Sequence, residues 1–476
     1  MSARQSGAKP RGASRPDGAR QGGATRPGHA APARVAAFRT LARVRAGATL
    51  ADAVARERET LGDARDRSLA HDLATGVLRW RSALDAALAT ASNRAIARVD
   101  ADVLDILRLG VYQMRHRDRL PAHAVVSDAV ALTRFAGHTS AAGFVNAVLR
   151  RLATTAADAP PSDTVVASDG AAAGLDTHAT RFAHPGWLVA RWTARLGVDA
   201  AIGWMRFDND PAPLTLRALP SAGTREALAE RLASAGVSVT PTRWAPAGLV
   251  VTAGNPLDHA ADVGFIVQDE ASQIVGELAA AWPARRRLDV CAAPGGKTLA
   301  LWAAGGDGQV VAGDRRPRRV RLLRETLARA GAGGIPIVQH DAAGPLPYRD
   351  VFDLVLVDAP CSGLGTLRRE PDLKWRRVEA ELATMAAVQT RMLAHAARVV
   401  APGGVLFYAT CSSEPDENDA VADAFLAAHP AFEPAGPPPA APAGVGGLLG
   451  EDGRLHTSPV THGLEAFFAA AFRRRG

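Results

Sequence analysis

The side chains best suited to covalent chemistry in this 476-residue chain are its three cysteines, Cys291, Cys361 and Cys411. An odd number of cysteines at long, unequal spacings, with no CxxC pair, argues against a disulfide framework and a structural zinc site, so we expect no metal. A thiol suits attack on an electron-poor ring carbon, because a few per cent of it is thiolate at neutral pH even at an unperturbed pKa of about 8.5.

The cysteines fall near the ends of predicted strands. Short apolar runs alternate with helical patterns in the C-terminal part of the chain, which is typical of a parallel sheet with crossover helices. If the strand order reverses between the first and fourth strands, Cys361 and Cys411 emerge at the same sheet edge. The expected strands are Leu288–Ala292, Gln309–Asp314, Ile335–Gln339, Leu354–Asp358 and Gly404–Thr410, followed by a last strand around Glu465–Phe472.

The segment CAAPGGKT (291–298) joins the first strand to the helix that begins near Lys297. Its small residues would let a ligand approach the backbone, and the helix N-terminus favours negative charge, although the segment is neither GxGxxG nor a Walker A motif. Asp314 ends the second strand, where a carboxylate can accept both ribose hydroxyls of a nucleoside cofactor. Asp341 follows the third strand, where its carboxylate could meet the edge of the cofactor's adenine. Each aspartate alone reads as a turn or cap residue, but together they outline a nucleoside pocket.

Two further regions precede this α/β part. Val103, Leu107, Val111 and Met114 recur at helical spacing, and similar patterns fill residues 35–152, which predicts a helical bundle. The middle region mixes helices at Trp187–Leu196 and Thr224–Gly236 with strand-like runs at Leu214–Leu219 and Gly248–Thr252. The expected parts are a disordered basic tail (1–33), a helical domain (34–153), a linker (154–180), a small α+β domain (181–285) and an α/β domain (286–476).

The basic excess gives little functional information. The formal net charge is +8, of which +5 lies in residues 1–33, so both an RNA-binding arm and a solvated tail remain open for that segment. No run of 18 apolar residues and no apolar signal core is present, so we expect a cytoplasmic protein that does not span a membrane. Only Lys9, Lys297 and Lys374 are lysines among the 56 basic residues, which makes each surviving lysine of interest.

Three motifs carry a specific resemblance. The segments DVCAAPGGKT (289–298), DAPCSGLGTLRREPDLKW (358–375) and YATCSSEPDEN (408–418) resemble the Nop/Sun family of RNA cytosine-5 methyltransferases, which use S-adenosyl-L-methionine. The helical segments VLRW (77–80), LRLGVYQM (107–114) and FVNAVLRR (144–151) resemble the NusB-like RNA-binding domain. This pairing is similar to the bacterial 16S rRNA methyltransferases of the Fmu/Sun type. It implies an all-α NusB-like domain, a small α+β domain and a Rossmann-like methyltransferase domain.

The resemblance also implies roles for single residues. Asp314 would take the ribose hydroxyls, Asp341 the adenine, and Asp358 would lie between cofactor and base, donating to cytosine N3 if it is protonated. Cys411 would be the nucleophile that adds to cytosine C6, and Cys361 would assist product release. The residues expected to line the methionine side of the cofactor are Cys291, Ala292, Ala293, Pro294, Gly295, Gly296 and Lys297. The base that removes the C5 proton is not identified.

We expect a monomer that acts on 16S rRNA, as free RNA or in an early assembly intermediate. A tRNA substrate and a NusB-like assembly factor without catalysis remain alternatives, although the complete motifs argue against the latter. A DNA cytosine-5 methyltransferase would rely on the Pro-Cys cysteine, and Cys411 argues against it. Arg368 and Arg369 could meet phosphates or be solvated, and Trp375 could stack on a base or pack under its loop. The segment HGLEAFF (462–468) departs from the family's Asp-Gly-Phe-Phe pattern.

Overall fold

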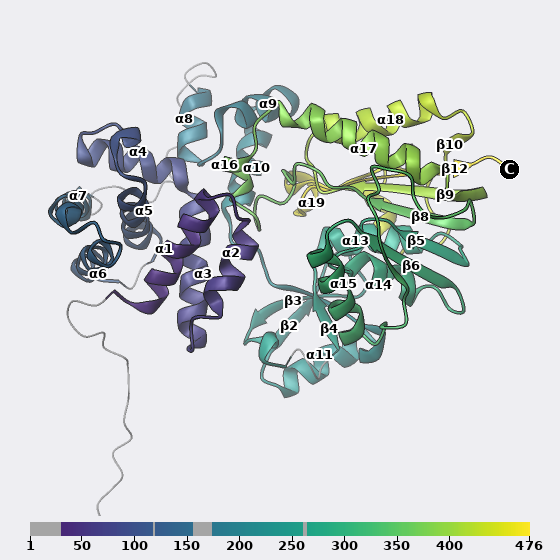
Figure 1. Ribbon diagram of the computed structural model, residues 1–476, viewed down its shortest axis with the longest axis horizontal. Coiled ribbons are helices and arrows are strands. Elements are labelled where there is room, and N and C mark those ends of the chain that lie inside the picture. Colours follow the sequence, from purple (N-terminus) through teal and green to yellow (C-terminus); the bar gives the residue numbers. More distant parts are fainter. Residues whose placement is uncertain (1–29, 118–119, 156–173, 260–263) are drawn as a thin grey trace, which may run out of the picture.

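The computed structural model describes residues 30–117, 120–155, 174–259 and 264–476, and Figure 1 shows their arrangement. The predicted tail (1–33) therefore lies almost wholly outside the described residues, and the first helix begins at Pro32. None of the helices in these ranges is long and apolar enough to cross a membrane.

An all-α domain forms the N-terminal part, as predicted. Helix α5 is its central element, because apolar side chains on every side of it, including Ile106, Leu107 and Leu109, are buried against the neighbouring helices. Asp100 starts this helix by accepting hydrogen bonds from the backbone N–H groups of Asp102 and Val103. The helices are α1 (Pro32–Arg45), α2 (Leu50–Arg58), α3 (Ala64–Arg79), α4 (Arg81–Ser92), α5 (Ala101–His116), α6 (Ala122–Phe135) and α7 (Ala142–Thr155).

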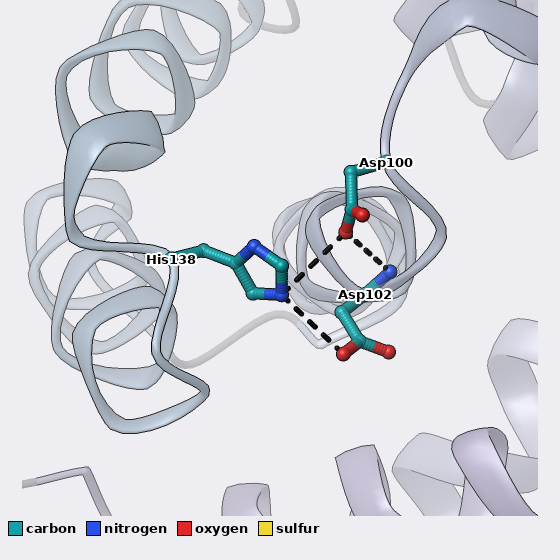
Figure 2. A group of neighbouring side chains, drawn as sticks. All are labelled: Asp100, Asp102 and His138. Carbon is teal, nitrogen blue, oxygen red and sulfur yellow. Dashed lines mark hydrogen bonds and ion pairs between the residues drawn. The ribbon is translucent and has the colours of Figure 1, made fainter.

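Asp100, Asp102 and His138 form the one group of three or more potential metal ligands in the described part of the chain (Figure 2). His138 Nε2 lies 3.4 Å from an oxygen of Asp102 and 3.6 Å from one of Asp100. Asp100 already caps α5, and the Arg45 guanidinium pairs with Asp102 and Asp105. A guanidinium beside these carboxylates disfavours a metal cation, so the group serves to tie α1, α5 and the end of α6 together.

The middle region holds a helical connection and an antiparallel sheet of strand order β2-β3-β1-β4. The predicted strands at 214–219 and 248–252 are present, while β2 and β4 were not predicted. Helix α8 occupies the end of the predicted linker (154–180), whose residues 156–173 lie outside the described ranges. The elements are α8 (Gly174–Arg181), α9 (Gly186–Leu196), α10 (Val198–Asn209), β1 (Thr215–Ala218), α11 (Arg225–Ser234), β2 (Ser238–Pro241), β3 (Gly248–Ala253) and β4 (Phe265–Val267).

The C-terminal part is built on a sheet of order β10-β12-β9-β8-β5-β6-β7, in which β9 to β7 run parallel and β12 is antiparallel to β9. This Rossmann-like arrangement confirms the predicted fold class. Its strands are β5 (Arg286–Asp289), β6 (Gln309–Asp314), β7 (Ile337–Gln339), β8 (Phe352–Asp358), β9 (Val400–Thr410), β10 (Phe432–Pro434), β11 (Leu455–His456) and β12 (Phe468–Arg474).

Helices cover both faces of this sheet. One face packs against α13, α14 and α15, and the other against α17 and α18, each with its own apolar core (Figure 1). Helix α13 packs on α14, although it falls within the range predicted for the middle domain (181–285). The helices are α13 (Glu270–Ala280), α14 (Gly296–Ala303), α15 (Pro317–Arg329), α16 (Leu373–Arg376), α17 (Glu381–Ala397), α18 (Asp419–Ala428) and α19 (Pro459–His462).

The strand order reverses between β5 and β8. This reversal is the condition under which Cys361 and Cys411 were expected to emerge at the same edge of the sheet. The chain winds outward from β5 to β6 and β7 on one side, and from β8 to β9 on the other. Loops that follow β5, β8 and β9 therefore meet at the carboxyl edge of the sheet, which is where ligands bind in open α/β folds.

Candidate active site

The two strand-end cysteines meet at this edge. The Sγ atoms of Cys361, which follows β8, and Cys411, which follows β9, are 3.2 Å apart. The hydrogen bond with Cys361 raises the pKa of the Cys411 thiol well above its ordinary value, and burial and the charge of Asp358 add to this effect. In this state Cys411 is therefore a thiol, and its conversion to a nucleophile requires loss of a proton.

Lys297 and Asp358 form an ion pair beside the thiols. The ammonium of Lys297 donates to Asp358 Oδ2 at 2.7 Å and contacts the Ser272 hydroxyl at 3.2 Å. Burial lowers the pKa of Lys297, but the charge of Asp358 and this hydrogen bond outweigh burial and raise it. Cys411 also raises the pKa of Lys297, so a thiolate at Cys411 would be stabilised by the same ammonium. This ion pair between Lys297 and Asp358 was not predicted from the sequence.

The loop after β5 lines a cavity of about 810 Å³, a size typical of small-molecule sites. β4 of the middle domain and α15 complete the walls. Gly295 has a φ of +119°, a conformation that side chains disfavour, and it lets the loop turn into α14. Of the residues predicted for the cofactor, those in the lining are Cys291, Ala292, Ala293, Pro294, Gly296, Lys297 and Asp358.

The two other predicted cofactor carboxylates differ in setting. Asp314 is buried at the end of β6, where it accepts hydrogen bonds from the backbone of Ala293 and Arg316 and an ion pair from Arg319 at 3.0 Å. Asp341 is half exposed, accepts from the Ala343 N–H and lies 3.6 Å from Arg315. Neither is in the lining of the cavity among the described residues.

Buried carboxylates behind the cysteines are functional candidates that the sequence analysis missed. Glu417 accepts hydrogen bonds from the Ser362 backbone N–H at 2.9 Å and from the Ser412 hydroxyl at 2.6 Å. Glu414 accepts from the Arg191 guanidinium at 2.8 Å and from Trp192 Nε1 at 3.0 Å, which ties α9 to the loop after Cys411. Their place within the segment 408–418 was the only sequence signal, because Ser362, Arg191 and Trp192 are remote from them in the chain.

The loop after Cys361 contacts the other domains rather than solvent. Arg369 pairs with Asp269 at 2.7 Å and with buried Glu465 at 2.9 Å, and Arg368 donates to the carbonyls of Asp210 and Pro211. Both arginines are therefore held by protein groups, and contact with an RNA phosphate stays a prediction. Glu465 begins the EAFF segment (465–468), so Arg369 contacts the segment that departs from the family pattern.

The end of the same loop docks on the helical domain. Trp375 packs against the core of that domain and donates from Nε1 to the carbonyl of Leu78 at 2.6 Å, so it packs and does not stack on a base. Lys374 is buried and donates to Asn209 Oδ1 at 2.8 Å. Burial lowers the pKa of Lys374 to about 7, although the charge of Asp208 acts in the opposite direction.

Comparisons with known proteins agree with this three-part architecture. Residues 280–473 match the family described as 16S rRNA methyltransferase RsmB/F, residues 31–154 match the NusB family, and residues 184–258 match the ferredoxin-like domain of RsmF/B-like methyltransferases. The crystal structure of PH0851 superposes with a TM-score of 0.76 at 22% identity, covering 93% of this chain and 99% of that one, so the fold is shared.

Two curated relatives extend the match along most of the chain. Ribosomal RNA small subunit methyltransferase B of Pseudomonas putida is 34% identical over 409 residues, which cover 83% of this chain and 89% of that protein. The protein of the same name from Xylella fastidiosa strain Temecula1 is 35% identical over 435 residues, covering 88% of this chain and 95% of that protein. The chain therefore belongs to the RsmB/F family and is an S-adenosyl-L-methionine-dependent methyltransferase with a NusB-like N-terminal domain.

Proposed function

We propose that this enzyme methylates C5 of a cytosine in 16S rRNA through a covalent adduct between Cys411 and cytosine C6. The observation that carries the proposal is the position of two thiols, 3.2 Å apart, beside the Lys297–Asp358 ion pair. Both lie at the carboxyl edge of the sheet, next to the loop after β5 that lines the cavity. A target cytosine must be unpaired or extruded to reach them, as for other enzymes that act on a base.

The two thiols suit the ring chemistry of cytosine. C5 is a poor nucleophile in the aromatic ring, but addition of the Cys411 thiolate at C6 produces an enamine-like intermediate whose C5 is nucleophilic. S-adenosyl-L-methionine supplies an electrophilic methyl group when it is bound. After C5 is methylated, its proton passes to a base, the electrons of the C5–H bond restore the C5–C6 double bond, and Cys411 leaves C6 as a thiolate. Cys361, adjacent to Cys411, is assigned to this release stage.

The ion pair suits recognition of the cytosine edge. Asp358, as a carboxylate, can accept hydrogen bonds from the exocyclic N4 amine, which is how acidic side chains read cytosine. The Lys297 ammonium is the donor that can stabilise charge developing on the ring and on the leaving thiolate. This role for Asp358 is an alternative to the one in which a protonated Asp358 donates to N3.

The cavity loop and Asp314 support the assigned cofactor site. Small residues and the free end of α14 leave space for the methionine portion against Cys291–Lys297. Asp314 Oδ1 accepts only the Arg316 N–H among the described residues, so this oxygen retains capacity for a ribose hydroxyl. Asp341 is exposed enough to meet the adenine edge, the role we propose for it.

Cysteine variants test the proposal. We expect Cys411→Ala to abolish transfer of labelled methyl groups to unmodified 16S rRNA, because no other thiol is at the end of β9. We expect Cys361→Ala to form the adduct and release it slowly, so that a labelled protein–RNA band accumulates on a denaturing gel. Substantial methyl transfer by Cys411→Ala would contradict its role as nucleophile, and the lack of any gel-stable adduct with Cys361→Ala would contradict the two-cysteine scheme.

The choice of 16S rRNA over tRNA rests on the names of the relatives and on the family description. Assays with matched 16S rRNA and tRNA transcripts test it, since preferential labelling of tRNA would overturn it. Calorimetry with S-adenosyl-L-methionine distinguishes an rRNA or tRNA methyltransferase from an assembly factor without catalysis, because we would expect the assembly factor not to bind the cofactor.

A further inference from the structure

The two cysteine loops are joined behind the sulfurs by one buried carboxylate. Glu417 lies in the short 3-10 turn η5 (Pro415–Glu417) and has no exposed surface. Its Oε1 accepts from the backbone N–H of Ser362, the residue after Cys361, at 2.9 Å. Its Oε2 accepts from the hydroxyl of Ser412, the residue after Cys411, at 2.6 Å.

Further hydrogen bonds close this arrangement. The Ser362 and Ser412 hydroxyl oxygens are 3.1 Å apart. Gln389 of α17 donates from Nε2 to Glu417 Oε1 at 2.9 Å and to the carbonyl of Pro360, the residue before Cys361, at 3.1 Å. The side chains of Ser362, Ser412, Gln389 and Glu417 are buried, so loss of the Glu417 acceptor would leave unsatisfied donors that water does not reach.

Cys361 depends on this arrangement more than Cys411 does. Cys411 directly follows β9, whose Thr410 pairs with Phe468 of β12 and whose Ala409 pairs with Asp358 of β8. Cys361 lies in irregular backbone, where the hydrogen bonds of its neighbours run to Glu417, Gln389 and Arg377. Loss of the Glu417 side chain therefore removes one of the ties on the Cys361 loop, while the sheet still holds Cys411.

We propose that Glu417 is a positioning residue that fixes the Cys361 sulfur against the Cys411 sulfur and so controls release of the methylated product. This inference rests on the proposed function. It assigns no proton transfer to Glu417, which acts only through Ser362 and Ser412. A displacement of about 1 Å at a catalytic group can cost on the order of 100-fold in rate, so a small shift of Cys361 would be measurable.

The experiment compares adduct formation with adduct decay on unmodified 16S rRNA, with labelled S-adenosyl-L-methionine and denaturing gels. Glu417→Met removes both acceptor oxygens at similar length, and we expect decay to slow by about tenfold or more while formation changes by less than about threefold. Glu417→Gln retains one oxygen for Ser362 and Gln389 and can donate to Ser412 Oγ, so we expect it to restore decay to within about threefold of the wild type.

A matched pair of hydroxyl deletions covers the case in which Glu417→Met does not fold. Ser412→Ala removes one arm of the bridge, and we expect the adduct to accumulate to an intermediate extent. Ser413→Ala removes a neighbouring hydroxyl that donates to Glu414 Oε1 at 2.8 Å and leaves the carboxylate bridge of Glu417 intact, so we expect wild-type partitioning.

The outcomes separate this inference from the proposed function. If the wild type forms no 5-methylcytosine, the proposed function fails. A second outcome is that the wild type is active, and that Ser412→Ala and every folded Glu417 variant form and lose the adduct at wild-type rates. That outcome overturns the positioning role, while the proposed function stands. Equal slowing of both steps would likewise show a general structural effect.

Discussion

At the scale of single residues, the two described lysines occupy enclosed sites in a chain whose other basic residues, apart from Lys9, are arginines. Lys297 has a side-chain exposure of 11% and pairs with Asp358, and Lys374 is buried against Asn209. An ammonium is a compact charge on a flexible stem, whereas a guanidinium needs a wide planar site. Both positions therefore suit lysine for reasons of space as well as charge, which explains why two lysines fall inside the motifs.

The protonation of Cys411 can be tested directly. Because the hydrogen bond with Cys361 is the largest cause of its raised pKa, the Cys411 thiol should become more reactive as pH rises through the neutral and alkaline range. We expect the rate of alkylation of Cys411 in the free enzyme, followed by mass spectrometry, to increase about tenfold per pH unit from about pH 7 to 9. In Cys361→Ala this profile should move to lower pH. A profile independent of pH would show that Cys411 is already a thiolate.

At the scale of elements, the central strands were predicted well because buried parallel strands are continuous apolar runs. β6 has the predicted bounds, and β8 begins only two residues before the predicted Leu354. The edge strands of the middle domain were missed, since β2 is largely exposed and ends in a proline and β4 has only three residues. Such short elements depend on their neighbours in the sheet rather than on their own pattern.

The loop 363–375 shows what a local pattern cannot predict. Its arginines were predicted to meet phosphates or solvent, and Trp375 to stack on a base or pack under the loop, yet the partners of all three come from segments far away in the chain. The pairing of Glu417 with Ser362, 55 residues apart, was hidden for the same reason. The cysteines were found because their strand-end positions follow from local periodicity alone.

Docking of this loop on the helical domain gives a stability prediction. Lys374→Met leaves Asn209 Oδ1 without its donor and removes a cation from the neighbourhood of buried Asp208, so we expect a loss of about 2–4 kcal/mol. Arg318→Met is the matched control, because it breaks the exposed contact of Arg318 with Asp52 and should cost less than about 1 kcal/mol. Denaturant unfolding measures both. Equal effects would show that the buried lysine contributes no more than a surface pair.

The same variant should show a defined pH dependence. Burial raises the pKa of Asp208 to about 7, while the charge of Lys374 lowers it. A carboxyl whose pKa is raised by folding contributes stability at low pH that is lost as pH rises through the folded pKa. Up to the folded pKa of about 7 both proteins lose stability equally with rising pH, so the difference between them should stay constant. Above about pH 7 the wild type loses no more stability through Asp208 and gains stability as Lys374, whose pKa is also about 7, releases its proton, so the difference should widen. A difference that stays constant above about pH 7 would show that neither group titrates there.

At the scale of the whole molecule, the other domains brace the loops that carry the cysteines. The helical domain contacts the loop after Cys361 through Leu78 and Arg79, and α9 contacts the loop after Cys411 through Arg191. The net charge offered little guidance to this arrangement, since most of it lies in residues 1–33. The function follows instead from where three chain segments bring two thiols, a lysine and an aspartate together.

Bisulfite sequencing of 16S rRNA tests the central claim most directly. The comparison uses cells that lack the gene and the same cells complemented with the wild type or with Cys411→Ala at equal protein level. The account predicts that one protected cytosine loses its methyl group in the deletion strain, regains it with the wild type and does not regain it with Cys411→Ala. An unchanged cytosine pattern in the deletion strain, or full restoration by Cys411→Ala, would contradict the account.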